Sequence, residues 1–317
     1  MQLPAKLQQA IEQEAARIGL SKLAQAASEL SANYRFRQGG GDKFMTSEAH
    51  RIAYIATRMP ATYAALRAVL RALLMPVTSL LDLGAGPGTA AWAGVDALAE
   101  LQTITLIERD QELIRFGQMF AAQADHATLR AATWLAQDLA TTTFFPPHDL
   151  VICSYALGEL PAKTARDVVQ AAWQAASKAL VLIEPGSMNG FNLIKQLRED
   201  LLQAGGHLDA PCPHEQACPM SANDWCHFAA RVERSALHRK LKAGALGYED
   251  EKFSYVVLAK EPVQAASARV LRRPDVQTGF VQLQLCTTEG LQALTVTRRD
   301  KATFKRARKV NWGDAWE

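Results

Sequence analysis

Cysteine is the residue type with the most distinctive chemistry in this 317-residue sequence. Three of the five cysteines, Cys212, Cys218 and Cys226, fall within fifteen residues, with gaps of five and then seven residues between them. A fourth, Cys286, follows after 59 further residues. Cysteine thiolates bind zinc and iron–sulfur clusters. Four of them suit either a tetrahedral zinc ion or a four-iron, four-sulfide (4Fe–4S) cluster.

Three features of the cysteine segment favour the cluster over the alternatives. The gaps are longer than the Cys-x-x-Cys spacing usual for zinc. Cys212 and Cys218 are each followed by proline, as is frequent around iron–sulfur ligands. His214 and His227 keep a mixed Cys/His zinc site open, although an isolated histidine is more often a neighbouring or surface residue than a ligand. A segment without metal is the third alternative. Structural disulfides are disfavoured in the cytoplasmic chain that we expect.

A glycine-rich turn, residues 80–89 (LLDLGAGPGT), is the second candidate site. An apolar strand carries Asp82 near its end, and Gly84, Gly86 and Gly88 follow at every second position before a helical pattern begins. Glycines allow a sharp turn and a close approach of ligand to backbone, and a helix start offers free N–H groups. A dinucleotide site needs Gly-x-Gly-x-x-Gly. The observed Gly-x-Gly-x-Gly instead resembles the first motif of S-adenosylmethionine-dependent methyltransferases, and no Walker-type Gly-Lys-Ser/Thr follows.

The strands after this turn support the same interpretation. Residues 103–108 end in Glu108, 24 residues after Gly84, where a carboxylate would accept from two ribose hydroxyls. Residues 132–136 lead to Asp138, near an adenine edge, and residues 149–154 and 179–184 are two further strands. Cys153 belongs to the strand edge that would hold the ligand, although we expect a small buried residue there rather than a nucleophile. The sequence therefore predicts a cofactor site and no evident catalytic residue. The predicted cofactor residues are Asp82, Gly84, Gly86, Gly88, Glu108, Asp138 and Cys153.

The alternation of strands and helices predicts a Rossmann-like class I methyltransferase sheet, doubly wound and parallel. Four segments follow: an N-terminal helical region (1–76), an adenosylmethionine-binding methyltransferase domain (77–204), a cysteine-rich metal-binding insertion with a returning strand (205–260), and a small basic C-terminal β-module with a tail (261–317). We expect one helix over residues 1–30, a break over 31–41, two helices around Pro60, and a basic helix over 231–242. Short strands are expected over 268–298.

Charge is distributed unevenly along the chain. The net charge is +3, but residues 77–204 carry −6, while residues 1–76 carry +5 and residues 205–317 carry +4. Basic flanks around an acidic middle would hold a polyanion such as RNA, with ordinary solvated surface as the alternative. The candidate RNA-binding residues are Arg58, Arg231, Arg234, Arg239, Lys240, Arg272, Arg273, Lys305 and Arg306.

Composition bounds the location of the protein. With 49% hydrophobic and 21% charged residues the sequence is globular. No apolar run reaches 18 residues, so no membrane span is expected. The first 30 residues have neither the apolar core of a secretory signal nor the acid-poor character of a transit peptide. We therefore expect a cytoplasmic protein.

Several motifs occur together in this sequence: LGEL at 157–160, the Cys-Pro-His stretch, DWCHF at 224–228, YEDEKFSY at 248–255 and a terminal Trp-Gly-Asp. From about Arg58 onward, the chain resembles the Rsm-type family of methyltransferase-like proteins of the small ribosomal subunit, which has bacterial members and mitochondrial relatives. The resemblance implies an adenosylmethionine-type pocket at the glycine turn and contact with small-subunit ribosomal RNA. It also implies a 4Fe–4S cluster on Cys212, Cys218, Cys226 and Cys286.

Three functional hypotheses follow. The first is a cytoplasmic, cluster-bearing, adenosylmethionine-binding protein that acts on small-subunit ribosomal RNA or in subunit assembly, and is monomeric away from the ribosome. Whether it methylates anything is left open, with a leaning toward an enzyme. The second is a non-catalytic RNA-binding assembly factor. The third is a zinc-stabilised small-molecule methyltransferase.

Overall fold

The computed structural model describes residues 1–36, 45–242 and 244–317, and these divide into two compact units. The first unit contains Met1–Ser177 and Ala230–Glu251, and the second contains Lys178–Ala229 and Lys252–Glu317. The chain therefore passes from one unit to the other three times. No described helix is both long and apolar enough to span a membrane.

Four parallel strands form the sheet of the first unit, in the order β3-β2-β1-β4. They are β1 (Ser79–Leu83), β2 (Thr103–Glu108), β3 (Thr133–Ala136) and β4 (His148–Ser154). The helices between and after them are α4 (Thr89–Ala97), α5 (Gln111–Ala122), the short α6 (Ala127–Arg130), the 3₁₀ turn η1 (Leu157–Glu159) and α7 (Ala162–Ala175). The predicted strands that correspond to β1, β2, β3 and β4 are confirmed to within one residue at each end, because apolar runs fit a covered parallel sheet. The predicted strand over 179–184 instead begins three residues earlier, at Ala176.

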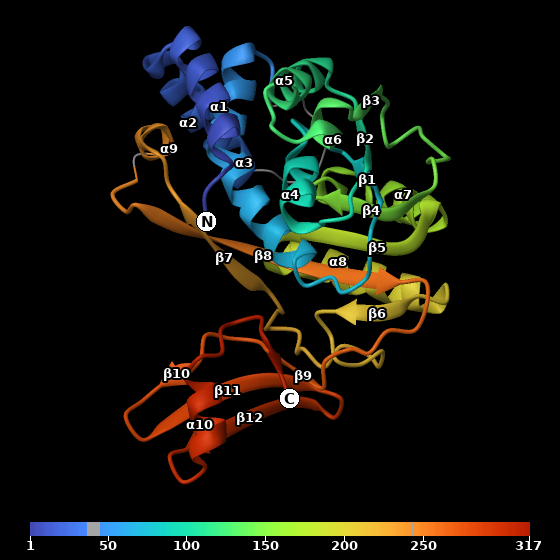
Figure 1. The fold of residues 1–317 in the computed structure, drawn as a ribbon, viewed down its shortest axis with the longest axis vertical. Helices are drawn as coiled ribbons and strands as arrows, with labels where there is room; N and C mark the ends of the chain where they lie inside the picture. Colours follow the sequence, from blue (N-terminus) through green and yellow to red (C-terminus); the bar gives the residue numbers. More distant parts are fainter. Residues whose placement is uncertain (37–44, 243) are drawn as a thin grey trace. The chain divides into compact units, whose positions relative to one another are not determined.

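Three helices precede this sheet: α1 (Ala5–Ile18), α2 (Leu20–Phe36) and α3 (Glu48–Leu70). Figure 1 shows them side by side in blue. The predicted single helix over 1–30 is wrong, because Gly19 adopts φ +94° and separates α1 from α2. The predicted break at residue 31 is also wrong, since α2 continues to Phe36, and residues 37–41 lie outside the described residues. The expected pair of helices around Pro60 is one helix, with Pro60 buried inside it.

A hairpin completes the first unit. Its elements are β7 (Phe228–Glu233), α9 (Ala236–Leu241) and β8 (Tyr248–Ala259), of which residues 230–251 belong to this unit. The predicted basic helix over 231–242 is wrong. Burial alternates from Ala230 to Glu233, which is the period of a strand. The helix starts only after Ser235, whose side chain accepts the backbone N–H of His238 at 3.1 Å.

The second unit contains two sheets. In one, β8 from Lys252 onward runs antiparallel to β5 (Ala176–Pro185) and to β6 (His207–Ala210), and α8 (Met188–Gln203) follows β5. In the other, β11 pairs with β12, β10 and β9, and β9 pairs with β13. The elements of this second sheet are β9 (Ala268–Val270), β10 (Asp275–Val276), β11 (Phe280–Thr287), β12 (Gly290–Thr297), α10 (Lys301–Ala307) and β13 (Ala315–Trp316).

These topologies confirm the α/β part of the predicted fold. Parallel strands joined by helices, with a reversal of the strand order at β1, form a Rossmann-like sheet of the methyltransferase type. The C-terminal β-module has its own apolar core, which includes Val270, Val281, Leu283 and Trp316. In such sheets, ligands bind beyond the carboxyl ends of the strands, which is where the predicted cofactor residues lie.

Candidate functional site

The glycine turn joins β1 to α4 in the first unit. Gly84, Gly86 and Gly88 adopt φ values of +70°, +54° and +85°, which favour glycine. A Cβ at Gly84 would lie 2.7 Å from the Cβ of Ala156, and one at Gly88 would lie 3.0 Å from the ring of Trp134. The segment after β4 and the ring of Trp134 in β3 therefore pack closely on the turn, and only glycine fits at these two positions.

Glu108 holds the turn from the end of β2. Its carboxylate accepts the backbone N–H of Gly86 at 2.8 Å, and those of Arg109 and Asp110 at 2.8 Å each. Burial raises the pKa of Glu108, and these three donors oppose the rise. A carboxylate has about four acceptor positions, so three are used by the backbone and one is left for a ligand hydroxyl.

Asp82 is the buried acid of the site. It is 1% exposed, and no described residue gives either carboxyl oxygen a hydrogen bond of ordinary geometry. Burial, with a smaller contribution from the nearby Glu108, raises the pKa of Asp82 to about 8. A buried polar group without a partner is costly. The residue is therefore suited to a cationic or hydrogen-bonding ligand at the turn.

Asp138 and Cys153 complete the set predicted from the sequence. Asp138 accepts the N–H of Ala140 at 2.9 Å and lies 3.6 Å from the guanidinium of Arg109. Cys153 is buried in β4 opposite Leu83 of β1. The structure thus gathers the predicted cofactor residues at one edge of the sheet, with Cys153 inside the sheet.

One residue at this edge escaped sequence reasoning. Tyr155 follows β4 with φ +56°, the left-handed region that non-glycine residues rarely occupy. Such strain concentrates at functional sites. No sequence signal marks it, because tyrosine has no preference for this conformation.

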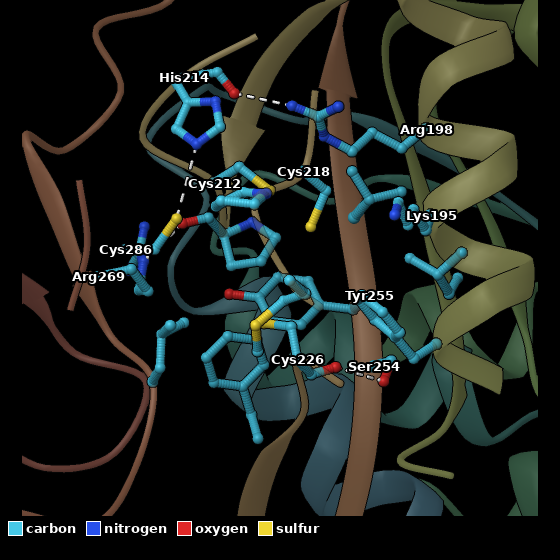
Figure 2. A pocket seen from close by; sticks show the side chains of 18 of the residues that line it. Lys195, Arg198, Cys212, His214, Cys218, Cys226, Ser254, Tyr255, Arg269 and Cys286 are labelled. Atoms are coloured by element: carbon cyan, nitrogen blue, oxygen red, sulfur yellow. Dashed lines mark hydrogen bonds between the residues drawn. The ribbon is translucent and has the colours of Figure 1, made fainter. Parts of the chain in front are cut away.

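The four candidate metal ligands line one cavity in the second unit, with an empty volume of about 620 Å³ including its open side. Figure 2 shows the labelled cysteine side chains around this common space. Cys212, Cys218 and Cys226 come from the segment between β6 and β7, and Cys286 comes from β11. Residues far apart in the sequence therefore converge on one place.

Hydrogen bonds from side chains to backbone carbonyls fix the cysteine segment on neighbouring strands. The hydroxyl of Ser254 in β8 donates to the carbonyl oxygen of Cys226 at 2.8 Å. The indole N–H of Trp225 donates to the carbonyl oxygen of Gly186, just after β5, at 2.9 Å. Arg269 of β9 donates to the carbonyl oxygen of Pro211 at 2.8 Å. The segment is thus attached to both sheets of the second unit.

Two polar side chains reach into this cavity from opposite sides. Arg198 of α8 is only 3% exposed and donates from Nη2 to the carbonyl oxygens of His214 and Gln216, at 2.8 Å each. The Nε2 atom of His214 lies 3.6 Å from the sulfur of Cys286. Arg198 was missed from the sequence, although it interrupts the apolar stripe formed by Phe191, Ile194 and Leu201, and that interruption is a usable signal.

Burial controls the charge of the cysteines. It raises the pKa of the Cys212 and Cys226 thiols and raises that of Cys286 to about 12. Repulsion between neighbouring thiolates adds to the rise, and the charge of Arg198 opposes it at Cys212. The thiols therefore stay protonated unless a cationic centre compensates the thiolate charge.

Coordination of a single metal ion requires several ligand side chains close together. Within residues 1–36, 45–242 and 244–317, no three His, Cys, Asp or Glu side chains lie close enough together to hold one metal ion. His227, one of the two histidines of the zinc alternative, is stacked on Trp225 at 5.3 Å and meets Trp312 edge-on at 4.9 Å between ring centroids. The metal-binding insertion stays a prediction.

The candidate RNA-binding residues fall into two groups. Four carry ion pairs: Arg58 with Glu251 at 3.1 Å, Arg231 with Asp250 at 2.8 Å, Arg234 with Glu249 at 2.7 Å, and Arg272 with Asp224 at 2.5 Å. Arg239, Lys240, Arg273 and Lys305 are exposed, and the guanidinium of Arg306 lies 4.1 Å from the ring centre of Trp316. Arg234 is the least available to phosphate, because only 15% of its side chain is exposed.

Comparison with known sequences decides the family. The family described as mitochondrial small ribosomal subunit Rsm22 matches residues 48–317, a range that includes both the glycine turn and all four cavity cysteines. The chain belongs to the Rsm22 family.

Two curated relatives of this Rsm22-family chain are mitochondrial proteins. Ribosome assembly protein METTL17 of Homo sapiens is 26% identical over 303 residues, which cover 84% of this chain and 62% of the human protein. Rsm22-cox11 tandem protein 2 of Schizosaccharomyces pombe is 25% identical over 323 residues, which cover 83% of this chain and 42% of the yeast protein. The chain thus spans less than two thirds of either relative.

Solved structures give only distant similarity. Magnesium protoporphyrin IX methyltransferase of Synechocystis PCC 6803 with bound SAM has a TM-score of 0.43 and 14% identity, covering 73% of this chain and 91% of that one. Precorrin-6y C5,15-methyltransferase of Geobacter metallireducens GS-15 has a TM-score of 0.39 and 15% identity, covering 61% and 85%. The fold assignment rests on strand order and pairing.

Proposed function

We propose that this Rsm22-family chain is an adenosylmethionine-binding, methyltransferase-like protein that acts on small-subunit ribosomal RNA or in assembly of the small ribosomal subunit. The observation that carries the proposal is the family match over residues 48–317. The human relative is named a ribosome assembly protein, which supports the same process. We further propose a cytoplasmic protein that is monomeric away from the ribosome.

The glycine turn fits adenosylmethionine. Gly86 is partly exposed and nothing lies within 4 Å of the position that a Cβ would take there, so the turn leaves open space for a ligand beside its backbone. Glu108 would accept from the ribose with its remaining acceptor position, Asp138 would lie at the adenine end, and Asp82 offers a buried acid to the ligand's cationic end. The bound sulfonium supplies an activated methyl group. Methyl transfer needs mainly an acceptor held in line, so the lack of an evident base does not oppose catalysis.

The cysteine cavity fits a thiolate-bound 4Fe–4S cluster held by Cys212, Cys218, Cys226 and Cys286. The donor set is four thiols around a single space, and the buried Arg198 carries a positive charge beside them. A cluster with four thiolates is negatively charged and needs more room than one ion. The buried guanidinium of Arg198 makes a neutral or positively charged group in the cavity unfavourable. The group would tie β11 to the segment after β6.

Exposed basic side chains in both units support contact with RNA. Arg239 and Lys240 lie on α9, and Arg273, Lys305 and Arg306 lie in the C-terminal β-module. Phosphate contacts release counterions, so binding of a small-subunit RNA fragment should weaken steeply with salt. Charge removal at Lys305 should lower the salt slope by about one, whereas Arg234, held by Glu249, serves as the matched control with a smaller change. If Lys305→Ala left the salt dependence of RNA binding unchanged, Lys305 would not contact RNA phosphate and the proposed RNA-binding surface would be wrong.

The decisive experiment combines composition with ligand binding. Anaerobically purified protein should absorb broadly near 400 nm and contain about four irons and four sulfides per chain. Isothermal titration should detect adenosylmethionine binding, and methyl incorporation into ribosomal RNA would establish catalysis. Colourless protein with one zinc and no RNA affinity would replace the proposal by the zinc-stabilised small-molecule methyltransferase.

A non-catalytic assembly factor is the second candidate. It is favoured by Glu108, whose carboxylate is already used by three backbone N–H groups of its own chain. In that case the turn is kept for structure or for sensing the ligand. Adenosylmethionine binding without methyl incorporation, or RNA binding without adenosylmethionine binding, would select this alternative.

A further inference from the structure

A buried arginine holds the loop that carries the first two cavity cysteines. Arg198 projects from α8 and donates from one nitrogen to two carbonyl oxygens, those of His214 and Gln216. Both acceptors lie between Cys212 and Cys218, so one side chain holds the middle of this loop at two points. Figure 2 shows Arg198 and His214 joined at the upper rim of the cavity.

The same loop carries a donor to the fourth cysteine. The ring of His214 points from the loop toward Cys286, and its Nε2 atom lies 3.6 Å from the sulfur of Cys286. Cys286 comes from β11, 72 residues away in the sequence. The contact therefore joins the loop fixed by α8 to a strand of the C-terminal β-module.

We infer that His214 donates a hydrogen bond from Nε2–H to the Cys286 thiolate of the bound cluster, and that Arg198 is the positioning residue that holds His214 in place. This inference rests on the cluster proposed above, and it fixes the tautomer because a metal-bound thiolate accepts hydrogen bonds but has no proton to donate. His214 is then neither a ligand nor a surface residue. It tunes the electronic state of one ligand.

The direction of the effect follows from electrostatics. A hydrogen bond withdraws electron density from the thiolate and weakens its bond to iron. It also stabilises the reduced cluster more than the oxidised one, because reduction adds negative charge. Removing the donor should therefore strengthen the iron–sulfur bond to Cys286 and move the reduction potential to more negative values.

The test compares His214→Ala with His214→Gln after anaerobic reconstitution. Resonance Raman spectra report the terminal iron–cysteine stretching bands of the oxidised cluster, and a redox titration reports the potential. We expect His214→Ala to keep four irons, to shift one terminal band to higher frequency and to lower the potential. His214→Gln keeps an amide N–H donor and should lie close to the wild type. Arg198→Lys keeps the positive charge but loses the paired hydrogen bonds to the carbonyl oxygens of His214 and Gln216. Its Raman bands and reduction potential should therefore resemble those of His214→Ala.

Several outcomes decide the inference. His126→Ala is the matched control, because His126 is exposed in the first unit and does not line the cavity; it should match the wild type. Equal bands and potentials in wild type and His214→Ala would overturn the inference, as would nitrogen coupling showing His214 bound to iron. If His214→Ala loses its iron, retention by His214→Gln supports the inference and loss by both overturns it. A wild-type protein without iron and sulfide would instead refute the proposed cluster itself.

Discussion

At the scale of single residues, Asp82 couples the glycine turn to pH. Its carboxyl is buried without a hydrogen bond of ordinary geometry from any described residue, and its pKa is raised to about 8. The ordinary value is 3.8, which applies in the unfolded chain. Between these two values the folded state keeps a proton that the unfolded state has lost. The free energy of unfolding should therefore fall as pH rises from about 4 to about 8.

We predict that Asp82→Asn removes this pH dependence. The amide does not titrate, so the variant should lose less stability than the wild type between pH 5 and pH 8. One titrating group contributes at most about 1.4 kcal/mol per pH unit. Urea unfolding of both proteins at three pH values measures the difference. Parallel curves for wild type and variant would show that Asp82 is already ionised in the fold.

Two glycines of the turn separate backbone strain from crowding. Alanine at either Gly84 or Gly86 must adopt a positive φ, at a cost of about 1–2 kcal/mol. At Gly84 the added methyl also meets Ala156 at 2.7 Å, whereas at Gly86 nothing lies within 4 Å. We predict that Gly84→Ala destabilises the first unit by a further ~1–3 kcal/mol relative to Gly86→Ala. Equal midpoints in urea would show that the segment after β4 moves aside.

At the scale of elements, the hairpin of β7, α9 and β8 depends on one carboxylate. Glu249 lies within ion-pair distance of Arg234, Lys242 and His238, at 2.7, 3.0 and 3.3 Å. Burial raises the pKa of Glu249, but these donors outweigh it and hold the pKa well below the usual range. Its stabilising contribution is therefore present above the unfolded pKa of about 4.5 and is lost as pH falls below it.

We predict that Glu249→Gln destabilises the protein by about 2 kcal/mol, because the partly buried Arg234 and Lys242 lose the carboxylate that pairs with both of them. Asp250→Asn is the matched control. Its partner Arg231 is largely exposed, so that change should cost roughly 0–1 kcal/mol. Guanidinium unfolding at pH 7 compares the two variants. Equal losses of unfolding free energy in the two variants would mean that burial does not strengthen the ion pairs of Glu249.

Strands were easier to predict than helices in this chain. β1, β2 and β4 are apolar runs that only a covered parallel sheet can bury, so their bounds follow from composition. Helix boundaries instead depend on the backbone conformation of single residues and on burial by the rest of the fold. Gly19 breaks a pattern that reads as continuous, whereas Pro60 sits within a helix because its surroundings are buried on all sides. Tertiary burial outweighed the proline, and no local signal reports that burial.

The two candidate sites differ in how far the sequence reveals them. The spacing of Gly84, Gly86 and Gly88 predicts a turn, because few other structures need a glycine at every second position. The four cysteines predict a set of metal or cluster ligands from their residue type alone. The groups around them are less visible: Arg198 and Tyr155 act through burial and backbone conformation, and both properties arise only in the folded chain.

At the scale of the whole molecule, the cysteine cavity links segments across the second unit. We predict that Cys226→Ser lowers the iron content, removes absorbance near 400 nm and destabilises the C-terminal half, because one centre ties distant segments together. Cys153→Ser is the matched control: Cys153 lies in β4 of the first unit and does not line the cavity, so its variant should keep its iron. Retained iron and unchanged melting in Cys226→Ser would refute the ligand assignment.

The three passages of the chain between units also set an order for synthesis. The first unit lacks its hairpin until residue 251 has been made. By then three of the four cavity cysteines have already been added, but Cys286 is still to come. Domains generally fold from the N-terminus during translation. A growing chain therefore carries an incomplete set of these thiols for sixty residues, and delivery of the proposed four-thiolate centre would have to wait until all residues of the first unit have been made.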